Sequence, residues 1–262
     1  MGGVKTGGVH ATIYDEQRRP ITAGGFVKNG PVIFKDIAKQ AGMTIWQHGW
    51  VRRTSASSSR RSASASGTVF IDYDNDGWKD LLVANGHVRP AVDHHPWGPP
   101  GRSGRLLFDN IGGKKFELVP AVEGTALAHT YVGRGMAVGD LFNDGKMDVV
   151  INVMDGPPAL LLDVSPDKRN WIDIKLVGRP KSPRDAIGAT VYLTANHMRQ
   201  RGDVISGGSY ASTNDPRLHF GLGDATIIDD VEVHWPSGAK ERFHIPKIDR
   251  IVTLADCYGT KF

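Results

Sequence analysis

Apolar and polar positions alternate along much of the chain, most clearly in its C-terminal third. Residues 170–178 (NWIDIKLVG) follow a period of two, as a strand with one buried face does. Residues 230–245 have the pattern of a hairpin with Pro236-Ser237-Gly238 in its turn. Further strands are expected at 188–195 and 250–255. Because such runs recur without a long helical pattern, the sequence predicts a β-sandwich-like C-terminal domain.

Shorter apolar runs predict strands earlier in the chain as well. Residues 9–27 have the pattern of two strands joined by a turn, and residues 105–119 that of a hairpin with Gly112-Gly113 in its turn. One short helix is expected at 34–41. The predicted fold class is therefore all-β.

One segment interrupts this pattern with a cluster of acidic side chains. In FIDYDNDGWKDLLVANG, four aspartates occupy positions 1, 3, 5 and 9 of a loop between two apolar runs: Asp72, Asp74, Asp76 and Asp80. Carboxylates this close repel one another unless a cation lies between them. Calcium takes six to eight oxygen ligands, and a loop with oxygens at alternate positions can wrap around it. The carbonyl of Trp78 at position 7 would add a ligand, and Gly77 would allow the sharp turn.

This loop differs from the calcium loop that joins two helices. That motif needs a glutamate at position 12, where this chain has Val83. The flanking runs are short and rich in β-branched residues, which favours strand–loop–strand. A solvated acidic turn is the alternative interpretation, because Asp, Asn and Gly are the common turn residues.

A second segment, GMAVGDLFNDGKMDVVIN at 135–152, repeats the pattern. The positions equivalent to 1, 5, 7 and 9 are Asp140, Asp144, Lys146 (through its carbonyl) and Asp148. Position 3 is Phe142, which supplies no ligand, so weaker calcium binding is expected here. Two copies of one strand–loop–strand unit predict a repeat architecture.

The formal net charge of +4 comes from one stretch of sequence. Residues 51–66 hold four of the 32 basic residues, and without them 28 basic residues face 28 acidic ones. This Ser/Ala/Arg stretch lacks the apolar residues of a core and is predicted to be disordered. A nucleic-acid-binding tail and the product of a shifted reading frame are the alternatives. We expect no specific nucleic-acid partner.

Other features limit the classes of protein to consider. No apolar run approaches the ~20 residues of a membrane span, and the first residues lack the apolar core of a signal peptide. The single cysteine, Cys257, allows no internal disulfide or Cys-based zinc site and is expected to be an idle or packed thiol. A zinc site at His87, His94 and His95 is disfavoured, because adjacent histidines point in different directions.

The two acidic segments resemble FG-GAP/VCBS-type β-propeller repeats. Five further segments, in this order, are similar to the ASPIC/UnbV domain: NWIDIKLVG, RDAIGATVYL, GGSYAS, LHFGLG and VEVHWPSG. The whole resemblance, over roughly residues 66–256, is to the cartilage acidic protein-like family. It implies a partial β-propeller followed by a β domain, bound Ca2+, and an extracellular or periplasmic location. Pro183 and Phe142 depart from the residues that the family usually carries at these positions.

Four regions are expected: an N-terminal β segment and short helix at 1–50, a low-complexity stretch at 51–66, FG-GAP/VCBS-type repeats at 67–165, and an ASPIC/UnbV-like β domain at 166–262. We interpret the chain as a non-enzymatic calcium-binding module for recognition or adhesion, whose partner is an unknown protein or glycan. The alternative is a hydrolase using Asp72 and Asp80 as acid and base, although no hydrolase motif accompanies them. The C-terminal domain is expected to fold by itself.

Overall fold

The computed structural model describes residues 65–86, 105–130, 132–154, 156–165 and 169–262, and the backbone of two short strands near the N-terminus. The chain divides into two compact units, residues 1–37 and 38–262. In the first unit, β1 (Ile13–Tyr14) pairs antiparallel with β2 (Pro20–Ile21), within the segment predicted to hold two strands. The helix expected at 34–41 and the three histidines considered for zinc lie outside the described residues.

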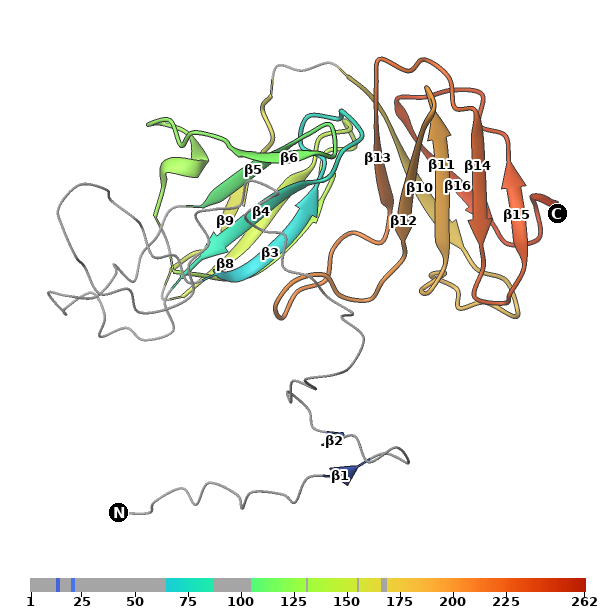
Figure 1. The fold of residues 1–262 in the computed structure, drawn as a ribbon, viewed down its shortest axis with the longest axis horizontal. Coiled ribbons are helices and arrows are strands. Elements are labelled where there is room, and N and C mark those ends of the chain that lie inside the picture. Colours follow the sequence, from blue (N-terminus) through green and yellow to red (C-terminus); the bar gives the residue numbers. More distant parts are fainter. Residues whose placement is uncertain are drawn as a thin grey trace, which may run out of the picture. The chain divides into compact units, whose positions relative to one another are not determined.

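Apart from one 3-10 turn, the regular secondary structure in the described part of the second unit consists of strands, which confirms the all-β class (Figure 1). A first repeat sheet contains β3 (Ala65–Ile71), β4 (Asp80–Asn85), β5 (Leu106–Ile111) and β6 (Lys115–Leu118). After a 3-10 turn, η2 (Ala126–Ala128), a second repeat sheet contains β7 (Gly133–Gly139), β8 (Asp148–Val153) and β9 (Ala159–Leu161).

Each repeat sheet begins with the predicted strand–loop–strand unit. In the first sheet, β3 and β4 pair antiparallel up to Ile71 and Asp80, where the acidic loop joins them. In the second, β7 and β8 pair up to Gly139 and Asp148. The hairpin of β5 and β6 turns at Gly112-Gly113 as predicted, with positive φ at both glycines. Strands, not helices, therefore flank both loops.

The two repeat sheets share one apolar core. Val69 and Ile71 of β3 pack in the same cluster as Met136 of β7 and Ile151 of β8. The strands come close because Gly67 has no side chain: a Cβ there would lie 2.8 Å from the carbonyl oxygen of Arg134. The packing of β3 beside β7 thus depends on this glycine.

The C-terminal domain is a sandwich of two sheets. Their strands are β10 (Asn170–Val177), β11 (Thr190–Ala195), β12 (Met198–Asp203), β13 (Leu218–Gly223), β14 (Asp230–His234), β15 (Lys240–Phe243), β16 (Arg250–Ala255) and β17 (Thr260–Lys261). One sheet has the order β13-β10-β16 and the other β12-β11-β14-β15-β17. Their facing sides meet in a buried core that includes Ile172, Leu193 and Val231. The predicted strands at 170–178, 188–195 and 250–255 and the 230–245 hairpin are all confirmed.

The low-complexity stretch at 51–66 is described only at its C-terminal end. Ala65 and Ser66, the last residues of the low-complexity stretch, belong to β3, and Ala65 pairs with Asn85. Residues 51–64 lie outside the described residues. Within the described segments, no helix is both long and apolar enough to cross a membrane.

Candidate metal centre

The first aspartate loop, residues 72–80, turns around the side chain of its first residue. Asp72 accepts hydrogen bonds from the backbone amides of Asp76 at 3.1 Å and Gly77 at 3.0 Å. The chain turns this tightly because Asn75 and Gly77 have positive φ angles of 59° and 91°. Asp72, only 1% exposed, therefore fixes the backbone of the loop as well as offering oxygens.

Asp80, the first residue of β4, closes the first aspartate loop. Its carboxylate accepts the backbone amide of Tyr73 at 3.2 Å and that of Asn110, on β5, at 2.8 Å. Asp76 is held more locally, because its carboxylate accepts the amide of Trp78 at 2.7 Å. The loop is thus held by hydrogen bonds from its own backbone to its carboxylates and by one hydrogen bond from Asn110 of β5.

Three of the predicted ligands come together in this loop. Carboxylate oxygens of Asp72, Asp74 and Asp80 lie within 4.8 Å of one another. Asp72 and Asp80 are buried, and Asp74 is half-buried. Asp76 is not one of the three, and the role of the Trp78 carbonyl stays a prediction. A group of carboxylates alone is the donor set that hard cations such as Ca2+ prefer.

Burial raises the pKa values of the carboxyls in the first aspartate loop. The pKa of Asp80 rises to about 7 and that of Asp76 to about 6, chiefly because burial penalises the charged form, with added repulsion from Asp72 and Asp74. Burial also raises the pKa of Asp72, although the nearby Lys79 opposes this. A bound cation would offset the cost of ionising these groups, so the residues present fit a cation.

Two basic residues that the sequence analysis missed contribute to the first aspartate loop. Arg169, which precedes β10, forms an ion pair with Asp74 at 2.5 Å and donates to its backbone carbonyl at 3.2 Å. Lys79 donates to the backbone carbonyl of His219 at 3.0 Å, and burial lowers the pKa of its amine. Arg169 and Asp74 are 95 residues apart, so no local spacing could have revealed this pair.

A further acidic residue lies beside each loop. Asp109, on β5, interacts with Asp80, and its pKa is raised first by burial and then by Asp74. Asp163, after β9, donates its backbone amide to Asp148 at 3.0 Å. One oxygen of the Asp163 carboxylate is buried and has no hydrogen-bond partner among the residues described. Asp109 lies on the second strand after its loop and Asp163 just beyond the second strand after its loop, so the spacing within the loops shows neither.

The second aspartate loop, residues 140–148, repeats the turn of the first. Asp140 accepts the backbone amides of Asp144 at 3.1 Å and Gly145 at 2.8 Å. Asn143 and Gly145 have positive φ angles of 57° and 81°. The duplication seen in the sequence is thus a duplication of backbone geometry and of hydrogen bonds.

The second aspartate loop differs from the first in its ligand set. Asp148 accepts the amide of Leu141 at 3.3 Å, and Asp144 accepts that of Lys146 at 3.1 Å, as in the first loop. At position 3, however, Phe142 is 62% exposed and offers no oxygen. Within the described part of the chain, no group of three acidic, histidine or cysteine ligands forms in this loop.

The residue at position 4 of the first loop connects it to its surroundings. Asn75 donates to the carbonyl of Gly145 in the second loop at 2.9 Å, and its side-chain oxygen lies 2.6 Å from Nε2 of His219 on β13. The other ring nitrogen of His219 lies 2.8 Å from the carboxylate of Asp173 on β10. The amide of Gly223 donates to the Asn75 carbonyl at 2.8 Å. Asn75 therefore links both loops to the C-terminal domain.

The second aspartate loop contacts the same strand. Arg217, just before β13, donates to the side-chain oxygen of Asn143 at 2.5 Å and to the carbonyl of Asp140 at 2.6 Å. On β13, a Cβ at Gly221 would lie 2.3 Å from the Asp72 carboxylate, so this glycine allows the first loop to pack closely. We call these contacts between the two loops and residues 217–223 the loop–β13 joint.

A second acidic group lies in the C-terminal domain but already has partners. Oxygens of Glu241 and Asp256 and the Cys257 thiol lie within 4.8 Å of one another. Glu241 is fully buried and accepts hydrogen bonds from the backbone amides of Cys257 and Gly259 and from the indole of Trp235. The neighbouring Asp256 raises the pKa of the exposed Cys257 thiol, which makes it a poor nucleophile. We interpret this group as structural.

Comparison with known families agrees with the C-terminal part of the predicted resemblance. Residues 178–259 match the family model described as ASPIC and UnbV. This segment of the chain is therefore similar to an ASPIC/UnbV domain, and it covers most of the sandwich, including β13 and therefore the C-terminal side of the loop–β13 joint.

The chain is also similar to longer proteins over more residues than the ASPIC/UnbV match covers. Cartilage acidic protein 1 of Xenopus tropicalis is 28% identical over 218 residues, which are 80% of this chain and 29% of the relative. The proteins of the same name from Mus musculus and Homo sapiens are each 30% identical over 201 residues, or 73% of this chain. The chain thus spans less than a third of the length of these relatives, and the similarity extends beyond the ASPIC/UnbV segment.

Proposed function

We propose that this chain is a non-enzymatic calcium-binding module for recognition or adhesion, with Ca2+ held by the first aspartate loop. The observation that carries the proposal is the approach of three carboxylates, from Asp72, Asp74 and Asp80, to within 4.8 Å in a loop whose backbone wraps around them. Oxygen-only donors on a curved loop suit Ca2+, which accepts irregular geometry, better than Mg2+, which demands a near-ideal octahedron.

Calcium in this loop would act on the loop–β13 joint. Asn75, between the ligands at positions 3 and 5, makes the contacts to His219 and Gly223. A cation that fixes the first loop would also fix Asn75, so it would hold the repeat sheets to the C-terminal domain. In this account the ion has a structural role.

The two repeat sheets are proposed to be blades of an FG-GAP/VCBS-type β-propeller. Support comes from the repeated strand–loop–strand unit and from the core that β3 and β7 share. The described sheets have four and three strands and do not themselves close a ring.

We place the protein outside the cytoplasm, in the extracellular space or the cell envelope. Support comes from the similarity to cartilage acidic protein 1 and from the proposed calcium loop, because calcium is abundant outside the cell and would fill even a weak site of about 10⁻⁴–10⁻³ M there. The partner of the module would be a protein or a glycan.

A hydrolase is the competing proposal, and one observation favours it: the raised pKa of Asp80, to about 7, would suit a general acid. The same carboxylate is only 1% exposed and accepts two backbone amides, which suits an ion ligand better than a group that must reach substrate. Generic ester, glycoside and phosphate substrates should therefore show no turnover; turnover that Asp80→Asn abolishes would favour the hydrolase.

Calorimetric titration with calcium tests the proposed function. The wild-type chain should bind one calcium ion in the first loop, and Asp74→Asn should weaken binding by about tenfold or more, since affinity follows the number of charged ligands. Asp185→Asn, an equal charge change at an exposed residue of the C-terminal domain, is the matched control and should leave binding unchanged. Absence of binding to the wild type, or equal affinities of the two variants, would contradict the proposal.

A further inference from the structure

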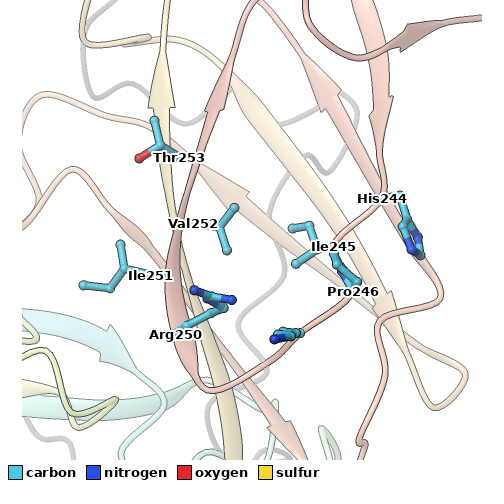
Figure 2. Close-up of a pocket in the computed structure, with 8 residues that line it drawn as sticks. His244, Ile245, Pro246, Arg250, Ile251, Val252 and Thr253 are labelled. Carbon is cyan, nitrogen blue, oxygen red and sulfur yellow. The ribbon is translucent and has the colours of Figure 1, made fainter.

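A groove of about 280 Å³ runs beside β16 in the C-terminal domain (Figure 2). One wall is residues 250–253 of β16, and the other is residues 244–247 of the connection from β15. Side chains along a strand alternate between its two faces. A groove that is lined by four consecutive residues of β16 therefore lies along the edge of this strand and not over one face. None of the residues that line the groove belongs to the aspartate loops or to the loop–β13 joint.

The wall formed by β16 is an open sheet edge. β16 is the last strand of the order β13-β10-β16 and pairs only with β10, in parallel, among the strands that the structure describes. The amide of Asp256 donates to the carbonyl of Val177, whose register partner is Ala255, and alternate residues along a strand face the same neighbour. Arg250 and Val252 therefore direct their main-chain groups toward β10, and those of Ile251 and Thr253 face away from it. Such an edge is a template for another strand.

The side chains around the groove are basic and apolar. Its three charged or titratable residues, His244, Lys247 and Arg250, are all exposed, and no acidic residue lines it. None of the three makes an ion pair or a side-chain hydrogen bond with any residue in the described segments. Figure 2 shows Arg250 and Val252 on the side of β16 that faces Ile245. The groove thus offers unpaired positive charge next to an apolar surface.

We propose that this groove binds an extended acidic segment of a protein partner, which adds to β16 as a further strand. Main-chain hydrogen bonds to Ile251 and Thr253 would supply affinity, as in other cases of strand addition. Side chains of the added strand alternate between faces, so its acidic residues would lie on the face of Arg250, near Lys247, while its apolar residues lie on the face of Ile251. A partner segment that alternates acidic and apolar residues fits both sets of contacts.

Two properties favour a peptide over other anionic ligands. The volume is slightly below the ~300–1,000 Å³ of ordinary small-molecule sites, and half of its wall is a strand edge. A sulfated or carboxylated glycan would use the positive charges but leave the main-chain groups of β16 unpaired. This inference goes beyond the proposed calcium site, and it would stand even if the first aspartate loop bound no ion.

A fluorescent peptide with the repeated sequence Glu-Val, seven residues long and blocked at both ends, is the probe. Its binding to the full chain, followed by anisotropy at low salt, should be at least about tenfold tighter than that of the matching Lys-Val peptide, because opposite charges attract across the groove. Equal binding of the two peptides, or tighter binding of the Lys-Val peptide, would overturn the proposal.

Charge reversal locates the site. The double variant Lys247→Glu/Arg250→Glu should lose at least about tenfold in affinity for the Glu-Val peptide, whereas Lys114→Glu/Lys181→Glu, with the same change in net charge, should lose less than about twofold. All four side chains are exposed, so both variants should fold. Equal losses in the two variants would show non-specific attraction and would overturn the assignment to β16.

The strand geometry has its own test. Two Glu-Val peptides are N-methylated, one at its odd positions and the other at its even positions. Each can then donate main-chain hydrogen bonds from only one of its two edges, so only the peptide whose donating edge faces β16 should keep its affinity. Amide signals of Ile251 and Thr253 should respond to the unmodified peptide in NMR spectra more than those of Arg250 and Val252. Equal affinities of the two methylated peptides, or stronger binding of a heparin-derived tetrasaccharide at the same amides, would overturn strand addition.

Discussion

In the first aspartate loop, position 3 holds Asp74, which is half-buried and paired with Arg169, whereas in the second loop it holds Phe142, which is 62% exposed. Around this one position the loops are alike. In each, the first aspartate accepts two amides across a turn with positive φ at positions 4 and 6. The hydrogen bonds that shape the loop therefore form whether or not position 3 holds a ligand.

The difference teaches that a sequence can keep the shape of an ion-binding loop after losing part of its chemistry. Asp140 and Asp148 are buried and hydrogen-bonded by backbone amides, which explains why they are useful to the fold even without a third ligand. Both loops also serve the loop–β13 joint through Asn75 and Asn143. The first loop is therefore proposed to bind and to join, and the second mainly to join.

The largest difference between the loops is expected when the asparagine at position 4 is replaced by glycine, which keeps the positive φ available. Asn75→Gly leaves the Gly145 carbonyl and His219 without their partner in a buried place, and should lower the free energy of unfolding by about 1–3 kcal/mol. Asn143→Gly removes one contact from an exposed residue and should cost less than about 1 kcal/mol. Chemical denaturation measures both; equal losses would contradict the distinction.

A gain of binding is expected when the missing ligand is restored. Phe142→Asp should bring a third carboxylate to the second loop and raise its affinity for calcium by about tenfold or more, because more charged ligands raise affinity. Calorimetric titration would then show a second site. Phe142→Ala removes the same exposed ring without adding a ligand and should show no second site. A second site in both variants would mean that position 3 is not what distinguishes the loops.

A smaller effect should follow from pH. In the calcium-free protein the pKa of Asp80 is raised to about 7, above its ordinary value of 3.8. The stability this group contributes is thus fully present below about pH 4 and is lost as the pH rises through about 7. Calcium replaces the proton, so the increase in Tm that calcium gives should grow between about pH 5.5 and pH 8. Asp80→Asn should abolish this trend, and an increase that shrinks with rising pH would contradict it.

The sequence was sufficient to predict much of the fold. Alternation located β10, β11, β16 and both hairpins, because each has one buried and one exposed face and a turn of ordinary chemistry. It also predicted that strands flank the acidic loops and that the loops repeat, since Asp and Gly recur at the same spacing. These features are local, so the residues that determine them are close in the chain.

The rest depended on contacts between distant residues. Arg169, Asp109 and Asp163 reach the loops from other parts of the chain, and no spacing within the loops indicates them. The expectation that the C-terminal domain folds by itself stays a prediction. The loop–β13 joint was not foreseen, because glycines such as Gly221 give no positive signal for close packing. Because the joint connects the first aspartate loop to the C-terminal domain, we expect chelator to lower the stability of both in the full chain.

Hydrogen exchange followed by mass spectrometry, with calcium and with chelator, tests the central claim most directly. At about 100-fold excess over Kd, a ligand that binds only the native state adds about 2.7 kcal/mol to the free energy of opening its site. Hydrogen exchange that requires this opening is then slowed by about 100-fold. Peptides covering residues 68–86 should show this protection, and those covering 136–152 much less. Equal exchange of residues 68–86 in both conditions, or protection confined to the second aspartate loop, would contradict the account.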